Sequence, residues 1–303
     1  MNSKARLSVF LLFLLWAGVS EAKLAIVTTT SNAKALVEEV AGDFASVLSF
    51  TEGGEDPHYL EAKPSFMIKL ARSDLLVAIG LDLEIGWLPA ILKGARNPDI
   101  QPGSLKYLEL GDHISPLEVM ERKASRLDGH VHEKGNPHFL LDPISAAKCA
   151  LVVAKRLAKI DPANKAYYFK RAESFKKRME LFTKKWQDKL AKKKQPKLIT
   201  YHKTLSYFLA RFNLRSLGSI EAKPGISPSP KYFFSLIEKI KREKVSLALI
   251  EHYFDDKAAL RLQKDAPQLK VKKVSVSVHA ERDLSSLELL YTHLARATYE
   301  GLL

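Results

Sequence analysis

Short apolar runs alternate with segments of helical periodicity from residue 24 to the C-terminus. Such runs, rich in β-branched residues and bounded by Gly, Pro, Asn or Asp, predict buried strands. The expected strands are 24–30, 47–50, 75–80, 106–110, 198–201, 216–220, 247–250 and 271–278. The expected helices are 32–41, one from about 64, 83–88, 143–159, 207–212, 232–241, 257–265 and 284–300. Strands that alternate with helices predict an α/β fold with mainly parallel sheets flanked by helices.

The longest periodic segment covers residues 161–195. Its apolar positions recur every three or four residues, which places them on one helical face: Tyr168, Ala172, Phe175, Met179, Phe182, Trp186 and Leu190. At ~1.5 Å per residue, about 30 helical residues span about 45 Å, enough to connect two lobes. We therefore predict an N-terminal α/β lobe at 23–160 and a C-terminal α/β lobe at 196–303, joined by this one long helix.

Residues 1–22 have the pattern of a secretory signal peptide. Two basic residues precede an apolar run at 7–19, and small residues stand where a signal peptidase reads. The run is shorter than the ~18–20 residues that span a bilayer. Because no cysteine follows it, we expect a soluble periplasmic protein that begins at Lys23 and carries no lipid anchor.

The composition, with 46% apolar and 27% charged residues, is that of a globular protein. The single cysteine, Cys149, lies in an apolar, helical segment. We therefore expect a buried, unoxidised thiol and no intramolecular disulfide.

The net charge of +14 is concentrated in one segment. Without residues 1–22, which carry two basic and one acidic residue, the charge is +13. Residues 163–197 alone carry thirteen Lys/Arg and three Asp/Glu, a net of +10. Their aromatic side chains fall on the apolar face, where they cannot stack on bases. We expect a solvated basic face, attractive to anionic lipids or lipopolysaccharide, and no nucleic-acid partner.

Three of the nine histidines fall in the loop 128–143. The loop is rich in Gly, Asn and Pro, and it ends at Asp142, an expected helix N-cap followed by proline. This helix start predicts that His138 is held still while His130 and His132 stay mobile.

Further candidate ligands follow predicted strands. His58 lies in the loop beyond one strand, and strand ends are expected at His202, Glu251 and His279. Open α/β sheets bind ligands at the carboxyl ends of their strands. Imidazole suits Zn, Cu, Fe and Ni, and three histidines with one carboxylate favour Zn(II). We therefore expect His58, His138 and His202 to converge on one transition-metal ion between the lobes.

At these residues the sequence resembles the substrate-binding components of zinc/manganese ABC transporters, periplasmic metal-binding receptors with a long linking helix. The matching stretches run in order along the chain: Asp56-Pro57-His58, Ser73-Asp74-Leu75, Gly80-Leu81-Asp82-Leu83-Glu84, Trp87-Leu88, Gly135-Asn136-Pro137-His138, Leu141-Asp142-Pro143, Tyr201-His202, Tyr207-Phe208 and Lys223-Pro224-Gly225-Ile226-Ser227-Pro228. The resemblance implies a receptor that captures Zn(II), rather than Mn(II) or Fe(II), and we expect it to be a monomer. It would deliver the metal to an ABC permease and its ATPase, peripheral to the inner membrane.

The resemblance also implies His58, His138 and His202 as the metal ligands. A histidine at the third position is associated with zinc-type members, and a glutamate there with manganese-type members. His130 and His132 lie where zinc receptors carry a longer loop thought to gather metal. Simple solvent exposure of these two histidines is the alternative interpretation.

The fourth ligand departs from the family pattern. Many members carry an aspartate just after the last strand, where this chain has His279. Glu251 is our first candidate, His279 the second and a water molecule the third. Asp56 and Glu55 are expected to lie behind His58 and to orient its ring.

A zinc-dependent hydrolase with a three-histidine site is the alternative function. Such an enzyme needs a general base beside an open metal position. The sequence contains neither a His-Glu-x-x-His nor a Gly-x-Ser-x-Gly motif. We therefore predict a binding protein and not an enzyme.

Overall fold

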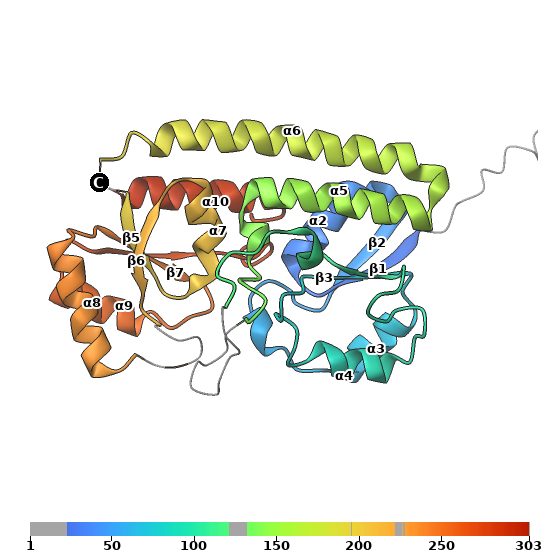
Figure 1. The fold of residues 1–303 in the computed structure, drawn as a ribbon, viewed down its shortest axis with the longest axis horizontal. Coiled ribbons are helices and arrows are strands. Elements are labelled where there is room, and N and C mark those ends of the chain that lie inside the picture. The colour runs from blue at the N-terminus through green and yellow to red at the C-terminus, as the bar shows by residue number, and fades with distance from the viewer. Residues whose placement is uncertain (1–22, 121–131, 195, 222–225, 227, 303) are drawn as a thin grey trace, which may run out of the picture.

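The computed structural model describes residues 23–120, 132–194, 196–221, 226 and 228–302. Two sheets of four parallel strands form two lobes, with the strand orders β2-β1-β3-β4 and β6-β5-β7-β8 (Figure 1). The N-terminal lobe contains β1 (Leu24–Thr28), β2 (Ala45–Ser49), β3 (Leu75–Ala78) and β4 (Tyr107–Glu109). The C-terminal lobe contains β5 (Lys197–Thr200), β6 (Arg215–Ser219), β7 (Leu247–Glu251) and β8 (Lys270–Val274). The predicted fold class is confirmed.

Helices cover both faces of each sheet, which is why the central strands are apolar on both sides. In the N-terminal lobe, α3 (Pro64–Ala71) and α4 (Leu88–Ala95) pack on one face, and α2 (Ser31–Ala41) and α5 (Pro143–Ile160) on the other. In the C-terminal lobe, α8 (Pro230–Arg242) and α9 (Lys257–Asp265) oppose α7 (Ser206–Arg211) and α10 (Leu287–Gly301).

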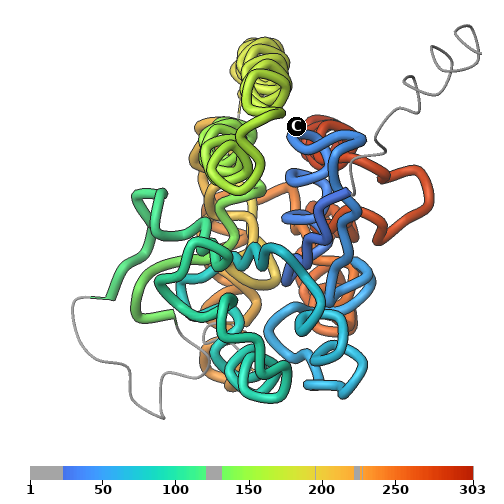
Figure 2. The backbone as a smooth tube through the Cα atoms, turned by 90° about the vertical axis from the view of Figure 1, so that its right-hand side faces the viewer, coloured from blue at the N-terminus to red at the C-terminus, as the bar shows by residue number. Residues whose placement is uncertain are grey.

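The long helix α6 (Lys165–Leu190) runs above both lobes, after a short 3-10 turn at Pro162–Asn164. All seven residues of its predicted apolar stripe are buried. They belong to one continuous core that also contains residues of both sheets. Figure 2 shows α6 as the outermost ridge of the molecule, with α5 beneath it.

The helix predicted at 83–88 is wrong. The chain leaves β3 through a turn in which Leu81 and Asp82 have left-handed backbone angles, with φ of 52° and 64°. The buried carboxylate of Glu84 accepts hydrogen bonds from two backbone N–H groups of this turn, at 2.8 and 3.0 Å. These bonds hold the turn in place, and α4 begins only at Leu88.

The last strand is also shorter than the predicted 271–278, because β8 ends at Val274. The next residues are buried but bond to the other lobe. The amide of Asn32 donates to the Val276 carbonyl at 2.9 Å and accepts from the Val278 N–H at 2.8 Å. The burial of this segment therefore comes from a contact between the lobes and not from pairing with a neighbouring strand.

Cys149 is fully buried and unpaired, as the sequence predicted. Among the described helices, none combines the length and the apolar character needed to cross a membrane.

Candidate metal centre

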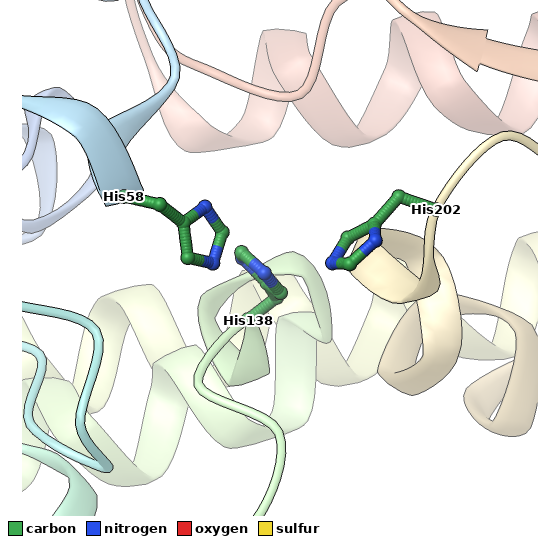
Figure 3. A group of neighbouring side chains, drawn as sticks. All are labelled: His58, His138 and His202. Carbon is green, nitrogen blue, oxygen red and sulfur yellow. The ribbon is translucent and has the colours of Figure 1, made fainter. Parts of the chain in front are cut away.

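Three histidines from distant parts of the chain meet between the lobes (Figure 3). His58 lies in a 3-10 turn, Pro57–Tyr59, beyond β2. His138 directly precedes the turn that leads into α5, and His202 follows β5. One ring nitrogen from each lies within 4.8 Å of the others. The carboxyl ends of the two sheets thus supply a compact group of three imidazoles.

His138 is held by the start of α5, as the sequence predicted. Its backbone N–H donates to the side-chain oxygen of Asn136 at 2.9 Å. Asp142 caps α5 by accepting from two backbone N–H groups at 3.0 and 3.2 Å. The same carboxylate accepts two bonds from Arg211 of α7, at 2.7 and 2.8 Å. This pair ties the helix after His138 to the helix after His202.

Carboxylates hold the other two rings. Asp56 Oδ1 lies 2.5 Å from His58 Nδ1, and Glu221 Oε2 lies 3.0 Å from His202 Nδ1. Burial opposes ionisation of Asp56, but the hydrogen bonds and charge of His58 hold the pKa of Asp56 below its ordinary value. Each carboxylate holds the Nδ1 side of its ring and thereby orients the ring.

Glu221 was not anticipated as an orienting residue. It follows the predicted strand 216–220 directly, so the rule that ligands gather at strand ends could have found it. Since β6 pairs with β5, which precedes His202, the carboxylate and the imidazole emerge from neighbouring strands. That adjacency depends on strand order.

Burial shapes the electrostatics of His138. Its desolvation, and then the neighbouring histidines, hold the pKa of His138 well below the ordinary value. The ring is therefore neutral at pH 7 and has a lone pair to offer. Its Nε2 is buried and has no hydrogen-bond partner among the described residues.

Glu251 ends β7 and is fully buried. Neither carboxyl oxygen has a hydrogen-bond partner in the described part of the chain. Burial raises the pKa of Glu251 to about 8, so the metal-free protein holds it largely protonated at pH 7. Its oxygens do not belong to the compact group that the three histidines form.

The other candidate histidines differ in their distance from the group. His279 is exposed and lies outside the group. His132, which the sequence placed on a mobile loop, has its Nε2 only 3.1 Å from His58 Nε2. Burial lowers the pKa of His132 to about 4, so this ring too is neutral at pH 7. His130 lies outside the described residues.

Together these groups suit a divalent transition metal. Neutral imidazole nitrogens are ligands for such ions, and carboxylates behind the rings strengthen them as donors. An open cavity of about 420 Å³, lined by His58, His132 and Asp82 among others, lies beside the group. The ring of His58 is therefore accessible from this cavity.

Comparisons with known proteins agree with this chemistry. A family model described as ZnuA, zinc-uptake complex component A, periplasmic, matches residues 26–300. The metal ABC transporter substrate-binding lipoprotein SsaB of Streptococcus sanguinis is 27% identical and aligns over 82% of this chain and 79% of its own length. The manganese ABC transporter substrate-binding lipoprotein PsaA of Streptococcus pneumoniae is 26% identical, over 80% and 77% respectively.

Solved structures share the fold. A crystal structure of ZnuA superposes with a TM-score of 0.79 at 23% identity, covering 93% of this chain and 100% of ZnuA. The Zn(II)-bound AdcAII mutant variant of Streptococcus pneumoniae gives a TM-score of 0.74 at 26% identity, covering 93% and 99%. The family match extends over nearly the whole chain, and this family consists of receptors and not of enzymes. The chain therefore belongs to the ZnuA family, the metal-binding substrate receptors of ABC transporters.

Proposed function

We propose that the protein binds Zn(II) between its lobes through His58, His138 and His202 and presents it to an ABC permease driven by an ATPase. The observation that carries this proposal is the approach of three ring nitrogens to within 4.8 Å of one another. A tetrahedral Zn(II) site needs three such donors and a fourth ligand.

Zinc is favoured over manganese by the donor set. Mn(II) prefers oxygen ligands, whereas imidazole suits Zn(II). The third position is the imidazole of His202, held by Glu221 at 3.0 Å. Relatives named for manganese are similar to this chain as well, so a direct comparison of the two metals is the required test.

Glu251 remains our first candidate for the fourth ligand. Its two unpartnered oxygens could accept a cation once the carboxyl loses its proton. His132 is the structural alternative, because its Nε2 already lies 3.1 Å from His58 Nε2. A water molecule is the third candidate. The exposed position of His279 makes it the weakest.

We further propose that the protein is exported to the periplasm, begins at Lys23 after cleavage and works there as a monomer beside the inner-membrane permease. The signal-peptide pattern of residues 1–22 supports this location. N-terminal sequencing of the exported protein tests the cleavage position, and a mature N-terminus other than Lys23 contradicts it.

Calorimetry on chelator-stripped protein tests the metal site. We expect one Zn(II) per chain, bound at least a hundredfold more tightly than Mn(II). His202→Ala should weaken Zn(II) binding at least a hundredfold, because one of three donors is lost. Replacing the exposed His113 with Ala is the matched control and should leave affinity unchanged. Unchanged affinity in His202→Ala would refute the site.

A further inference from the structure

The outward face of α6 carries lysines that form no ion pair among the described residues; the exposed Asp188 on the same face pairs with Lys184 at 3.5 Å. Lys170, Lys177 and Lys185 lie on it, and Lys192 continues the row just beyond the helix end. Their spacing of seven, eight and seven residues keeps them on one side of a helix with 3.6 residues per turn. All four are exposed, and none forms an ion pair within the described residues.

The two arginines of α6 fasten the helix to the rest of the protein. Arg171 donates to the Glu39 carbonyl at 2.6 Å. Arg178 pairs with Glu39 of α2 at 2.9 Å and with Glu288 of α10 at 3.2 Å. Lys176 and Lys184 pair within α6 with Glu173 and Asp188, at 3.9 and 3.5 Å. The two arginines are therefore structural, and the four lysines of the outward row form no ion pair among the described residues.

A single large apolar residue interrupts the outward row. Leu181 is 72% exposed and lies between Lys177 and Lys185, four residues from each. Because the buried face of α6 is formed by the opposite stripe, packing within the protein does not explain this leucine. An apolar side chain surrounded by lysines is suited to the boundary between lipid headgroups and acyl chains.

The shape of the molecule permits such a contact. Figures 1 and 2 both show α6 as a ridge with no other described element above it. At ~1.5 Å per residue its 26 residues extend about 39 Å, so the lysine row can meet a flat surface along its whole length. No α6 residue lines either cavity beside the histidine group, so contact through α6 leaves the metal site open.

We propose that the outward face of α6, the row of Lys170, Lys177, Leu181, Lys185 and Lys192, binds the surface of an anionic lipid bilayer. Lysines attract phosphate headgroups within about one Debye length, ~8 Å at physiological salt. Nucleic acid fits less well, because the helix buries Tyr168, Phe175, Phe182 and Trp186. Tyr167 and Phe169 are partly buried against the core, so the outward row itself carries no aromatic ring on which bases could stack.

Vesicle sedimentation tests this surface with the chain that begins at Lys23, which holds every described element. We expect binding to vesicles of phosphatidylglycerol and phosphatidylethanolamine at ~0.1 M salt, and none to phosphatidylcholine alone. Each lysine near an anionic bilayer contributes roughly fivefold in affinity. The triple variant Lys170→Glu, Lys177→Glu, Lys185→Glu should therefore bind at least a hundredfold more weakly.

A matched triple variant, Lys231→Glu, Lys241→Glu, Lys264→Glu, changes the net charge equally at exposed lysines of α8 and α9 and should lose less than tenfold. Leu181→Ser should lose at least threefold, because it removes apolar contact with the lipid. Circular dichroism and Zn(II) calorimetry should be unchanged in all variants. Absence of binding to anionic vesicles, an equal loss in the matched triple, or unchanged binding in Leu181→Ser would each overturn the proposal.

Discussion

Replacing Glu251 with Gln should change how the stability of the metal-free protein depends on pH. The glutamate is fully buried, and neither of its oxygens has a partner among the described residues. Burial raises its pKa from the ordinary 4.5 to about 8. Glutamine has nearly the same shape but carries no charge at any pH, so the substitution removes the titration and keeps the volume.

The expected magnitude follows from the two pKa values. Between pH 4.5 and pH 8 the folded protein holds a proton on Glu251 that the unfolded chain releases, so this contribution is lost as pH rises. Each unit of pH increase in this window lowers the free energy of unfolding of the wild type by about 1.4 kcal/mol relative to that of the variant. From pH 5 to pH 8 the stability difference between the two proteins should therefore change by about 4 kcal/mol. Burial also raises the pKa of Glu84, to about 7. Because Glu84 titrates in both proteins, its contribution cancels in the difference between them.

Urea unfolding of chelator-stripped wild type and Glu251→Gln at pH 5, 6, 7 and 8 measures this difference. The variant carries any constant cost of the buried amide at every pH, so only the slope is diagnostic. A difference that stays constant within about 1 kcal/mol would refute the reasoning. If Glu251 also ligates Zn(II), binding at pH 7 should release about one proton more from the wild type than from the variant. Calorimetry in two buffers of different ionisation enthalpy measures that proton.

Three further predictions concern stability and reactivity. Asp142→Asn keeps a good helix cap but loses the ion pair with Arg211, whose side chain is 32% exposed. Chemical unfolding should show that the free energy of unfolding falls by about 2 kcal/mol. A double-mutant cycle with Arg211→Gln should show that the two effects are not additive. Gly53→Ala should destabilise the protein by at least ~2 kcal/mol in thermal unfolding. The reason is that Gly53 has a φ of +104° and an added Cβ would lie 2.3 Å from the Val278 carbonyl oxygen. A loss of stability below ~0.5 kcal/mol would contradict this prediction. Cys149, whose pKa burial raises to about 12, should react with a thiol reagent only after denaturation, and rapid labelling of the native protein would show that its thiol is accessible.

Most of the fold could be predicted from local pattern. The strands around Ile26, Leu76 and Ala248 are apolar without alternation, which predicts sheets covered on both faces. The stripe from Tyr168 to Leu190 predicted which side of the long helix is buried. The pattern failed where burial came from another cause. Val276 and Val278 are buried because this segment packs between the lobes, where their backbone groups bond to Asn32. In the sequence, this pattern looks the same as a longer strand.

The three histidines could be selected because each lies at the end of an element, and the structure brings them together. Their role as ligands remains a prediction. The sequence did not indicate that Glu221 would hold His202, nor that the Nε2 of His132 would lie 3.1 Å from His58. These contacts join segments 19 and 74 residues apart, and only the strand order and the loop path bring them together.

The sequence by itself determined which face of each element is buried, because the apolar side chains of a buried face recur with the period of the helix or strand. It also determined that three imidazoles would stand at element ends, one of them four residues before the N-cap Asp142. Only the tertiary structure decided which groups surround them. The pairing of β5 between β6 and β7 places Glu221 against His202 and seals Glu251 away from water. Hydrogen-bond partners and pKa values depend on neighbours in space, and the order of residues along the chain does not specify those neighbours.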